Sequence, residues 1–141
     1  MSLMSVLLGH GTFAVEVAGV ASCQPEVEAI GGGELPAGKE RIVLAVLVPE
    51  ADNPYNAEAV RVQIQRLTVG YLAPADARTL RAALAREVLN VSRYRCRAKI
   101  EYVRDHRKGR TRQWRVWLDL CLQHVLAIVL TSPFFLVMSA G

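Results

Sequence analysis

The chain has 141 residues, of which 52% are hydrophobic, and a formal net charge of +4. This length suits one ordinary domain whose single core needs no disulfide or metal ion to fold. Cys23, Cys96 and Cys121 are far apart, and no cysteine or histidine pair has metal-ligand spacing. We therefore expect three reduced thiols in a cytoplasmic protein, and no metal or other cofactor.

Two segments resemble targeting signals without meeting their requirements. Residues 20–23 (Val-Ala-Ser-Cys) look like a lipoprotein cleavage box, but no Lys or Arg precedes them and His10 and Glu16 interrupt the apolar run. Residues 125–138 are strongly apolar but too short for a membrane-spanning helix, which needs about 20 such residues. Membrane insertion is not expected.

The first half of the chain predicts two strands and a short helix. Residues 1–12 are interpreted as an N-terminal tail. Residues 13–18 alternate apolar and other side chains, which is typical of a half-buried strand. Residues 24–30 fit a short helix that ends at a glycine triplet, and residues 41–48 form a β-rich run that we expect to be buried on both faces. The Asx and proline residues that follow predict a structured turn.

The second half predicts four more strands and the longest helix. Residues 60–64 and 68–72 read as strands separated by a tight break near Arg66. Residues 74–88 form an amphipathic helix with Pro74 at its first position. A long hairpin then follows, with strands at 94–103 and 112–120. In its first strand Cys96, Ala98 and Ile100 alternate with basic residues, so we expect one packed and one cationic face, and in its second strand Trp117 faces outward if Val116 and Leu118 face inward.

This order of short strands, without repeats or βαβ alternation, predicts a mainly β fold with one or two helices (α+β). We expect a small, modified OB-like or SH3-like β-barrel over residues 13–120. Residues 121–141 form an apolar C-terminal extension. Three roles are open for it: an extra strand or helix that covers a barrel edge, a self-association surface or a reversible membrane contact.

The charge is unevenly distributed. Residues 93–115 hold ten Lys/Arg against Glu101 and Asp105, which gives +8, whereas the rest holds seven Lys/Arg and eleven Asp/Glu, which gives −4. Such a basic arm on an acidic body indicates a polyanionic partner, most often nucleic acid. The alternative is a solvated basic hairpin with no partner.

Several motifs in the expected order carry a resemblance to a known family. Residues 52–60 read Asp-Asn-Pro-Tyr-Asn-Ala-Glu-Ala-Val, and residues 69–72 read Val-Gly-Tyr-Leu before a helix. Residues 17–19 with Gln24, and the strands at 97–100 and 116–120, fit the opening and closing parts. Over residues 13–120 the chain resembles the HIRAN domain family, in its stand-alone bacterial type.

The resemblance implies an OB-like barrel without catalysis of its own. In eukaryotic DNA-repair translocases such domains bind the 3′ end of single-stranded DNA, in repair and replication. By position, Asn53, Tyr55 and Asn56 match the loop that contacts the terminal nucleotide, and Tyr71 lines the same pocket. Asn56 stands where the family usually has Asp, and residues 21–22 (Ala-Ser) stand where DNA-end binders have Arg and an aromatic residue.

Physical chemistry points to the same region, because single-strand binders combine basic grooves with aromatic platforms. The expected nucleic-acid-binding residues are Asn53, Tyr55, Asn56, Arg61, Tyr71, Arg95, Arg97, Lys99, Arg112 and Trp117. Other readings compete: Tyr55 could plug the barrel, Asn53 could only fix its loop, and Trp114 could be core instead of a platform. The hypothesis requires the basic hairpin and the Asn-Pro-Tyr loop to share one surface, with guanidinium groups not covered by carboxylates.

No arrangement of acids, nucleophiles and histidines in the sequence suggests a catalytic site, so we do not expect an enzyme. The alternative function is a non-enzymatic protein-interaction or self-association module that uses residues 121–138.

Overall fold

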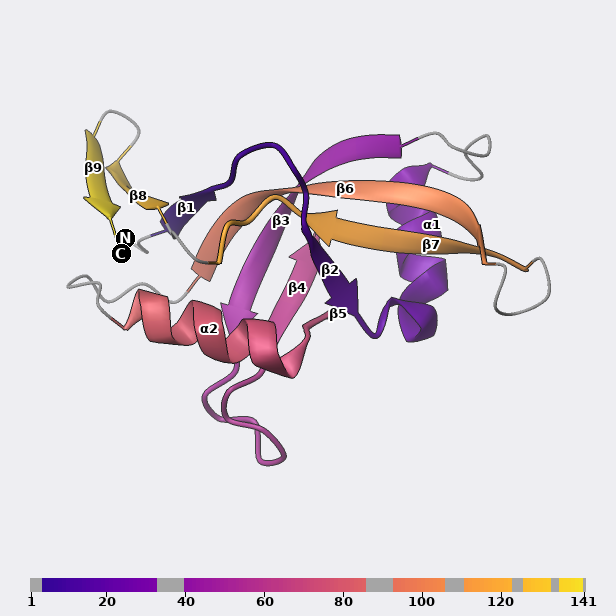
Figure 1. The fold of residues 1–141 in the computed structure, drawn as a ribbon, viewed down its shortest axis with the longest axis horizontal. Helices are drawn as coiled ribbons and strands as arrows, with labels where there is room; N and C mark the ends of the chain where they lie inside the picture. The colour runs from indigo at the N-terminus through magenta and orange to yellow at the C-terminus, as the bar shows by residue number, and fades with distance from the viewer. Residues whose placement is uncertain are drawn as a thin grey trace.

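Six antiparallel strands close into a β-barrel in this computed structural model, which describes residues 4–32, 40–85, 93–105, 111–122, 126–132 and 135–140 (Figure 1). The strands are β2 (Val15–Ala18), β3 (Glu40–Pro49), β4 (Val60–Ile64), β5 (Leu67–Leu72), β6 (Arg93–Asp105) and β7 (Thr111–Leu118). Their order around the barrel is β3-β4-β5-β2-β7-β6, and pairing of β3 with β6 closes it. The predicted small OB-like barrel with two helices is confirmed.

Two helices accompany the barrel. A 3-10 turn (η1, Val20–Cys23) leads into α1 (Gln24–Gly31), and α2 (Pro74–Leu84) follows β5 (Figure 1). In α2 the apolar stripe of Ala77, Leu80 and Leu84 is buried, as its spacing predicts. Residues 86–88 of the expected helix lie outside the described residues. No described helix is both long and apolar enough to cross a membrane.

The N-terminal residues are part of the sheet. Strand β1 (Met4–Leu8) pairs in parallel with the start of β6 and antiparallel with β8 (Leu126–Ser132), which pairs in turn with β9 (Phe135–Ala140). Leu7 is only 2% exposed. The predicted tail is therefore wrong over Met4–Leu8. The C-terminal extension contributes strands that pair with β1 and with each other and, in the described chain, not with a barrel strand, so its three possible roles stay open.

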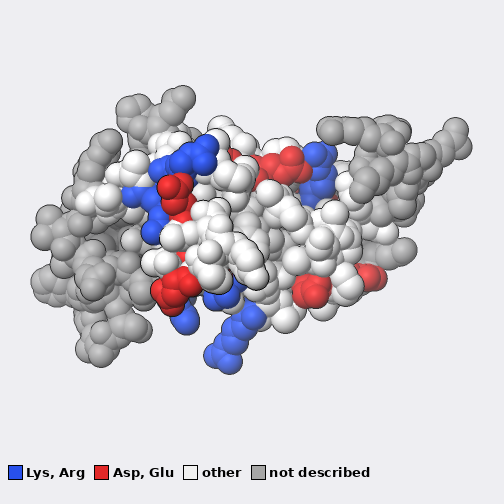
Figure 2. Space-filling model, turned by 90° about the horizontal axis from the view of Figure 1, so that it is seen from below, with Lys and Arg blue, Asp and Glu red and all other residues white. Residues whose placement is uncertain are grey.

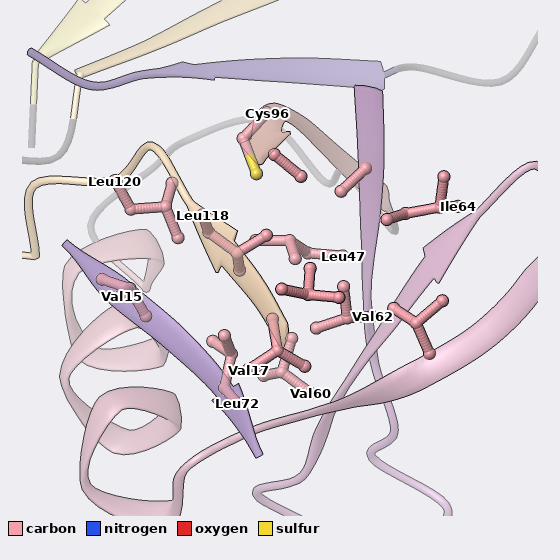
Figure 3. Close-up of a cluster of buried hydrophobic side chains, with 14 of the residues drawn as sticks. Val15, Val17, Leu47, Val60, Val62, Ile64, Leu72, Cys96, Leu118 and Leu120 are labelled. Atoms are coloured by element: carbon pink, nitrogen blue, oxygen red, sulfur yellow. The ribbon is translucent and has the colours of Figure 1, made fainter. Parts of the chain in front are cut away.

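The core lies inside the barrel, where alternate residues of each strand point inward (Figure 3). On β4 these are Val60, Val62 and Ile64, and on β6 they are Cys96, Ala98 and Ile100. Strand β3 corrects one prediction, since it was expected to be buried on both faces. Only Ala45 and Leu47 are fully buried there, whereas Ile42 and Leu44 are 49% and 55% exposed. A closed barrel buries only its inner face unless another layer covers the outside.

Two local features hold β5 in place. The β4–β5 turn contains Gln65 and Arg66, both with positive φ (51° and 67°), which is the conformation of a two-residue type I′ hairpin. A Cβ atom at Gly70 would overlap the carbonyl oxygen of Ala18 on β2. Glycine at this position therefore lets β2 and β5 approach closely beside Tyr71.

Candidate nucleic-acid interface

The loop between β3 and β4 is fixed by its own asparagines. The Oδ1 atom of Asn53 accepts hydrogen bonds from the backbone N–H groups of Tyr55 (2.9 Å) and Asn56 (3.1 Å). Asn56 Oδ1 accepts from the N–H of Glu58 at 3.0 Å. Both amide oxygens therefore satisfy loop backbone, which favours the loop-fixing role considered for Asn53.

Tyr55 stands at the outside of this fixed loop. Its side chain is 97% exposed, so the alternative in which it plugs the barrel is wrong. The backbone N–H of Tyr55 donates to Asn53 Oδ1, and this hydrogen bond restricts the backbone that carries the ring. An exposed ring on an ordered loop is available for stacking.

The carboxylate of Glu50 accepts hydrogen bonds from two side chains at the base of the loop. Its Oε2 accepts from Arg61 Nη1 at 3.1 Å, and its Oε1 accepts from Asn53 Nδ2 at 3.3 Å. The pKa of the Tyr71 phenol is raised, first by desolvation and then by the negative charge of Glu50. Asn53, Arg61 and Tyr71 are thus brought together around one carboxylate.

An open cavity of about 460 Å³ lies beside these groups. Its lining residues come from the end of β3, the loop and β4: Val48, Pro49, Glu50, Asp52, Asn53, Pro54 and Arg61. The Nε atom of Arg61 is buried, and no hydrogen-bond partner for it exists in the described part of the chain. An atom buried this deeply is not reached from the cavity, so a ligand there would meet the exposed third of the Arg61 side chain instead.

The basic face of β6 is largely neutralised within the molecule, so the condition that its cations stay uncovered by carboxylates fails at Arg97 and Lys99. Arg97 Nη2 lies 2.7 Å from Asp119 Oδ2, and Lys99 Nζ lies 3.6 Å from Glu40 Oε2. On β7, Arg115 is paired in the same way, with Glu16 at 2.7 Å. Among the described residues, no carboxylate lies within ion-pair distance of Arg95.

Trp117 lies on the outer face of the barrel, as its register predicts, but its surroundings are occupied. Its Nε1 donates to Glu101 Oε1 at 2.7 Å, and Arg115 Cζ lies 5.3 Å from the ring centroid. Lys99 Nζ lies 6.0 Å from it. These cations of the same molecule compete with any base that would stack on the indole.

Phe13 is an aromatic residue of this face that sequence reasoning missed. The Arg97 guanidinium lies 5.5 Å and the Lys99 ammonium 5.9 Å from its ring centroid. Alternation with Val15 and Val17 placed Phe13 on the inner face of a strand. Its positive φ of 48° ends that alternation before β2 begins, and no sequence signal marks such a conformation in Phe.

Trp114 is a core residue, which was one of its two expected roles. It is 4% exposed and stacks on Tyr102 with ring centroids 4.8 Å apart. The side-chain amide of Gln24 forms two hydrogen bonds with the backbone of Trp114. Its Oε1 accepts from Trp114 N (2.7 Å), and its Nε2 donates to Trp114 O (3.1 Å). Gln24, noted only as part of the opening motif, thus joins α1 to β7.

The residues of the expected interface lie at two different ends of the barrel. The β3–β4 loop lies where β3 ends and β6 begins, because Leu47 pairs with Tyr94, whereas the end of β6 that pairs with the start of β7, at Asp105 and Thr111, lies at the other end (Figure 1). Arg95 pairs with Val46, two residues before Val48 of the cavity, so the base of the hairpin shares a face with the loop. The side chains of Arg104, Arg107, Lys108, Arg110 and Arg112 lie outside the described residues.

On the face seen in Figure 2, acidic and basic side chains alternate instead of forming one basic patch. Comparison with known proteins finds no matching family model, no matching curated protein and no matching solved structure. The HIRAN resemblance therefore rests on the sequence motifs and stays a prediction.

Proposed function

We propose that this chain is a non-enzymatic nucleic-acid-binding module that holds single-stranded DNA or a DNA 3′ end at the β3–β4 loop, in a repair or replication context. One observation carries the proposal: the almost fully exposed ring of Tyr55 stands on an asparagine-fixed loop beside the cavity that contains Arg61. Ordered loops that present an aromatic ring beside a guanidinium suit binding of a base and its phosphate.

Each group has a defined role in this proposal. The Tyr55 ring stacks on a base, a contact worth about 1–3 kcal/mol. The Arg61 guanidinium, held by Glu50 through Nη1 and 33% exposed as a side chain, donates to a hydroxyl oxygen in the cavity. Arg95, which has no carboxylate partner among the described residues, contacts a phosphate across β3.

The ion pairs set the expected number of phosphate contacts. Arg61, Arg97, Lys99 and Arg115 each hold a carboxylate, so they add little to the binding of a polyanion. With about one phosphate bound, by Arg95, affinity for a single strand should fall with a log–log salt slope of about −0.7. This slope is much shallower than that of an uncovered basic ribbon.

Fluorescence anisotropy tests the proposal with labelled oligothymidylates that end in a 3′-hydroxyl or a 3′-phosphate, and with a duplex of equal length. Binding to the single strands at low salt is expected, with a loss of about tenfold in Tyr55→Ala. Arg95→Ala should weaken all oligonucleotides alike, whereas Arg78→Ala, an exposed cation on α2, serves as the matched control. No binding at low salt, or equal losses in Arg95→Ala and Arg78→Ala, would refute the proposal.

Self-association through the C-terminal segment is a second candidate function. Within the described chain β9 pairs only with β8, so the far edge of β9 is the end of the nine-stranded sheet. Strand edges offer unpaired backbone groups that another copy can pair with. Light scattering of the full chain at several concentrations tests this role, and a monomer throughout would exclude it.

A further inference from the structure

The outer faces of β3 and β6 form two facing rows of different chemistry. Pairing places Ile42 opposite Lys99, Leu44 opposite Arg97 and Val46 opposite Arg95. One row is aliphatic and the other is basic. Two members of the aliphatic row remain about half exposed, since nothing in the described chain packs over them.

A small pocket lies beside these rows where β1 leaves the edge of β6. It encloses about 160 Å³, close to the volume of one aliphatic residue, and is lined by Val6, Leu7, Leu8, Gly9, Leu44, Arg95, Cys96, Arg97 and Asp119. Leu8 and Leu44 stand at its rim, 40% and 55% exposed. The lining is mainly apolar, with two guanidinium groups at one side.

The charges along this strip indicate which kind of partner would bind there. Asp119 already neutralises Arg97, and Glu40 neutralises Lys99, so Arg95 is the cation left over in this strip among the described residues. The strip offers aliphatic side chains and a single available positive charge. That combination complements a protein segment with apolar side chains and a carboxylate better than it complements a run of phosphates.

We propose that this strip docks an extended segment of a partner protein in which an acidic residue lies two positions from an aliphatic residue. The aliphatic side chain enters the pocket between Leu8 and Leu44, and the carboxylate pairs with Arg95. This spacing fits because side chains two residues apart in an extended chain point to the same side, and Val46, which pairs with Arg95, lies two residues from Leu44.

A fluorescein-labelled eight-residue peptide with the repeat Leu-Ser-Glu-Ser, which places Leu and Glu on one face, is the Leu–Glu probe, with repeats of Leu-Ser-Lys-Ser and of Ser-Ser-Glu-Ser as controls. Anisotropy should show binding of the Leu–Glu peptide alone. Leu44→Ser should weaken it about tenfold or more, because a buried leucine contact is lost. Leu67→Ser is the matched control, as Leu67 is 37% exposed in the β4–β5 hairpin away from the strip.

The variants separate this proposal from nucleic-acid binding. Leu44→Ser and Leu8→Ser should reduce peptide binding and leave oligothymidylate binding unchanged, while Tyr55→Ala should do the reverse. Arg95→Gln should weaken the peptide also, and circular dichroism confirms that each variant is folded. The docking proposal is overturned by absent peptide binding, by equal affinities of wild type and Leu44→Ser, by Leu44-dependent competition from oligothymidylate, or by a Leu44-dependent dimer in sedimentation.

Discussion

The bond network of Gln24 gives the sharpest test of the fold. Its side-chain amide makes three hydrogen bonds, from Nε2 to Val20 O (2.9 Å), from Nε2 to Trp114 O (3.1 Å) and to Oε1 from Trp114 N (2.7 Å). Strand β2 pairs with β7 only at Leu118 and Trp117, so at Trp114 this amide serves in place of a neighbouring strand. Removing it leaves the Trp114 backbone without these bonds.

Replacing Gln24 by leucine should lower the free energy of unfolding by about 3 kcal/mol, at about 1 kcal/mol for each of the bonds lost. Urea unfolding followed by tryptophan fluorescence and circular dichroism measures the change. With a slope of about 2 kcal/mol per molar urea, the midpoint should fall by about 1.5 M. Gln63→Leu is the control, because Gln63 lies on the outer face of β4 without a side-chain hydrogen bond in the described chain. Equal midpoints for the two variants would refute this role of Gln24.

Three further predictions concern single sites. Gly70→Ala should destabilise the barrel by about 2 kcal/mol or more, as measured by thermal unfolding, because its Cβ would overlap Ala18. Burial raises the pKa of Cys96 to about 12, so at pH 8 only about one thiol in 10⁴ is ionised; mass spectrometry should find it unalkylated when native and alkylated in urea. Asp119→Ala should cost about 2 kcal/mol in urea unfolding, less than a fully buried pair because the Arg97 side chain is 55% exposed, and Asp119→Asn should cost less than Asp119→Ala.

Local chemistry was enough to predict most strands and the loop. Alternation predicted β4 and the inward face of β6, and the Asn53-Pro54 sequence predicted a fixed turn. These features depend on residues close together in the chain. Burial of β3 was predicted wrongly because an apolar run does not reveal whether a second layer covers it.

Long-range pairings account for what could not be predicted. Arg97 and Asp119 are 22 residues apart, and Arg115 and Glu16 are 99 apart, so the neutralisation of the basic ribbon depends on strand register. Charge counting treated these side chains as free. The position of the loop beside the start of β6 likewise follows only from the pairing of β3 with β6.

Strand β1 has a consequence for how the chain can be shortened. Strand β1 pairs with the edge of β6 at residues 93–95, and β7 pairs with the same edge from Ala98 onward. The other edge of β1 pairs with β8. Deleting the first eight residues would uncover two strand edges at once, one on the barrel and one on the C-terminal hairpin. Exposed edges of this kind recruit other chains, so a truncated protein should aggregate even where its barrel still closes.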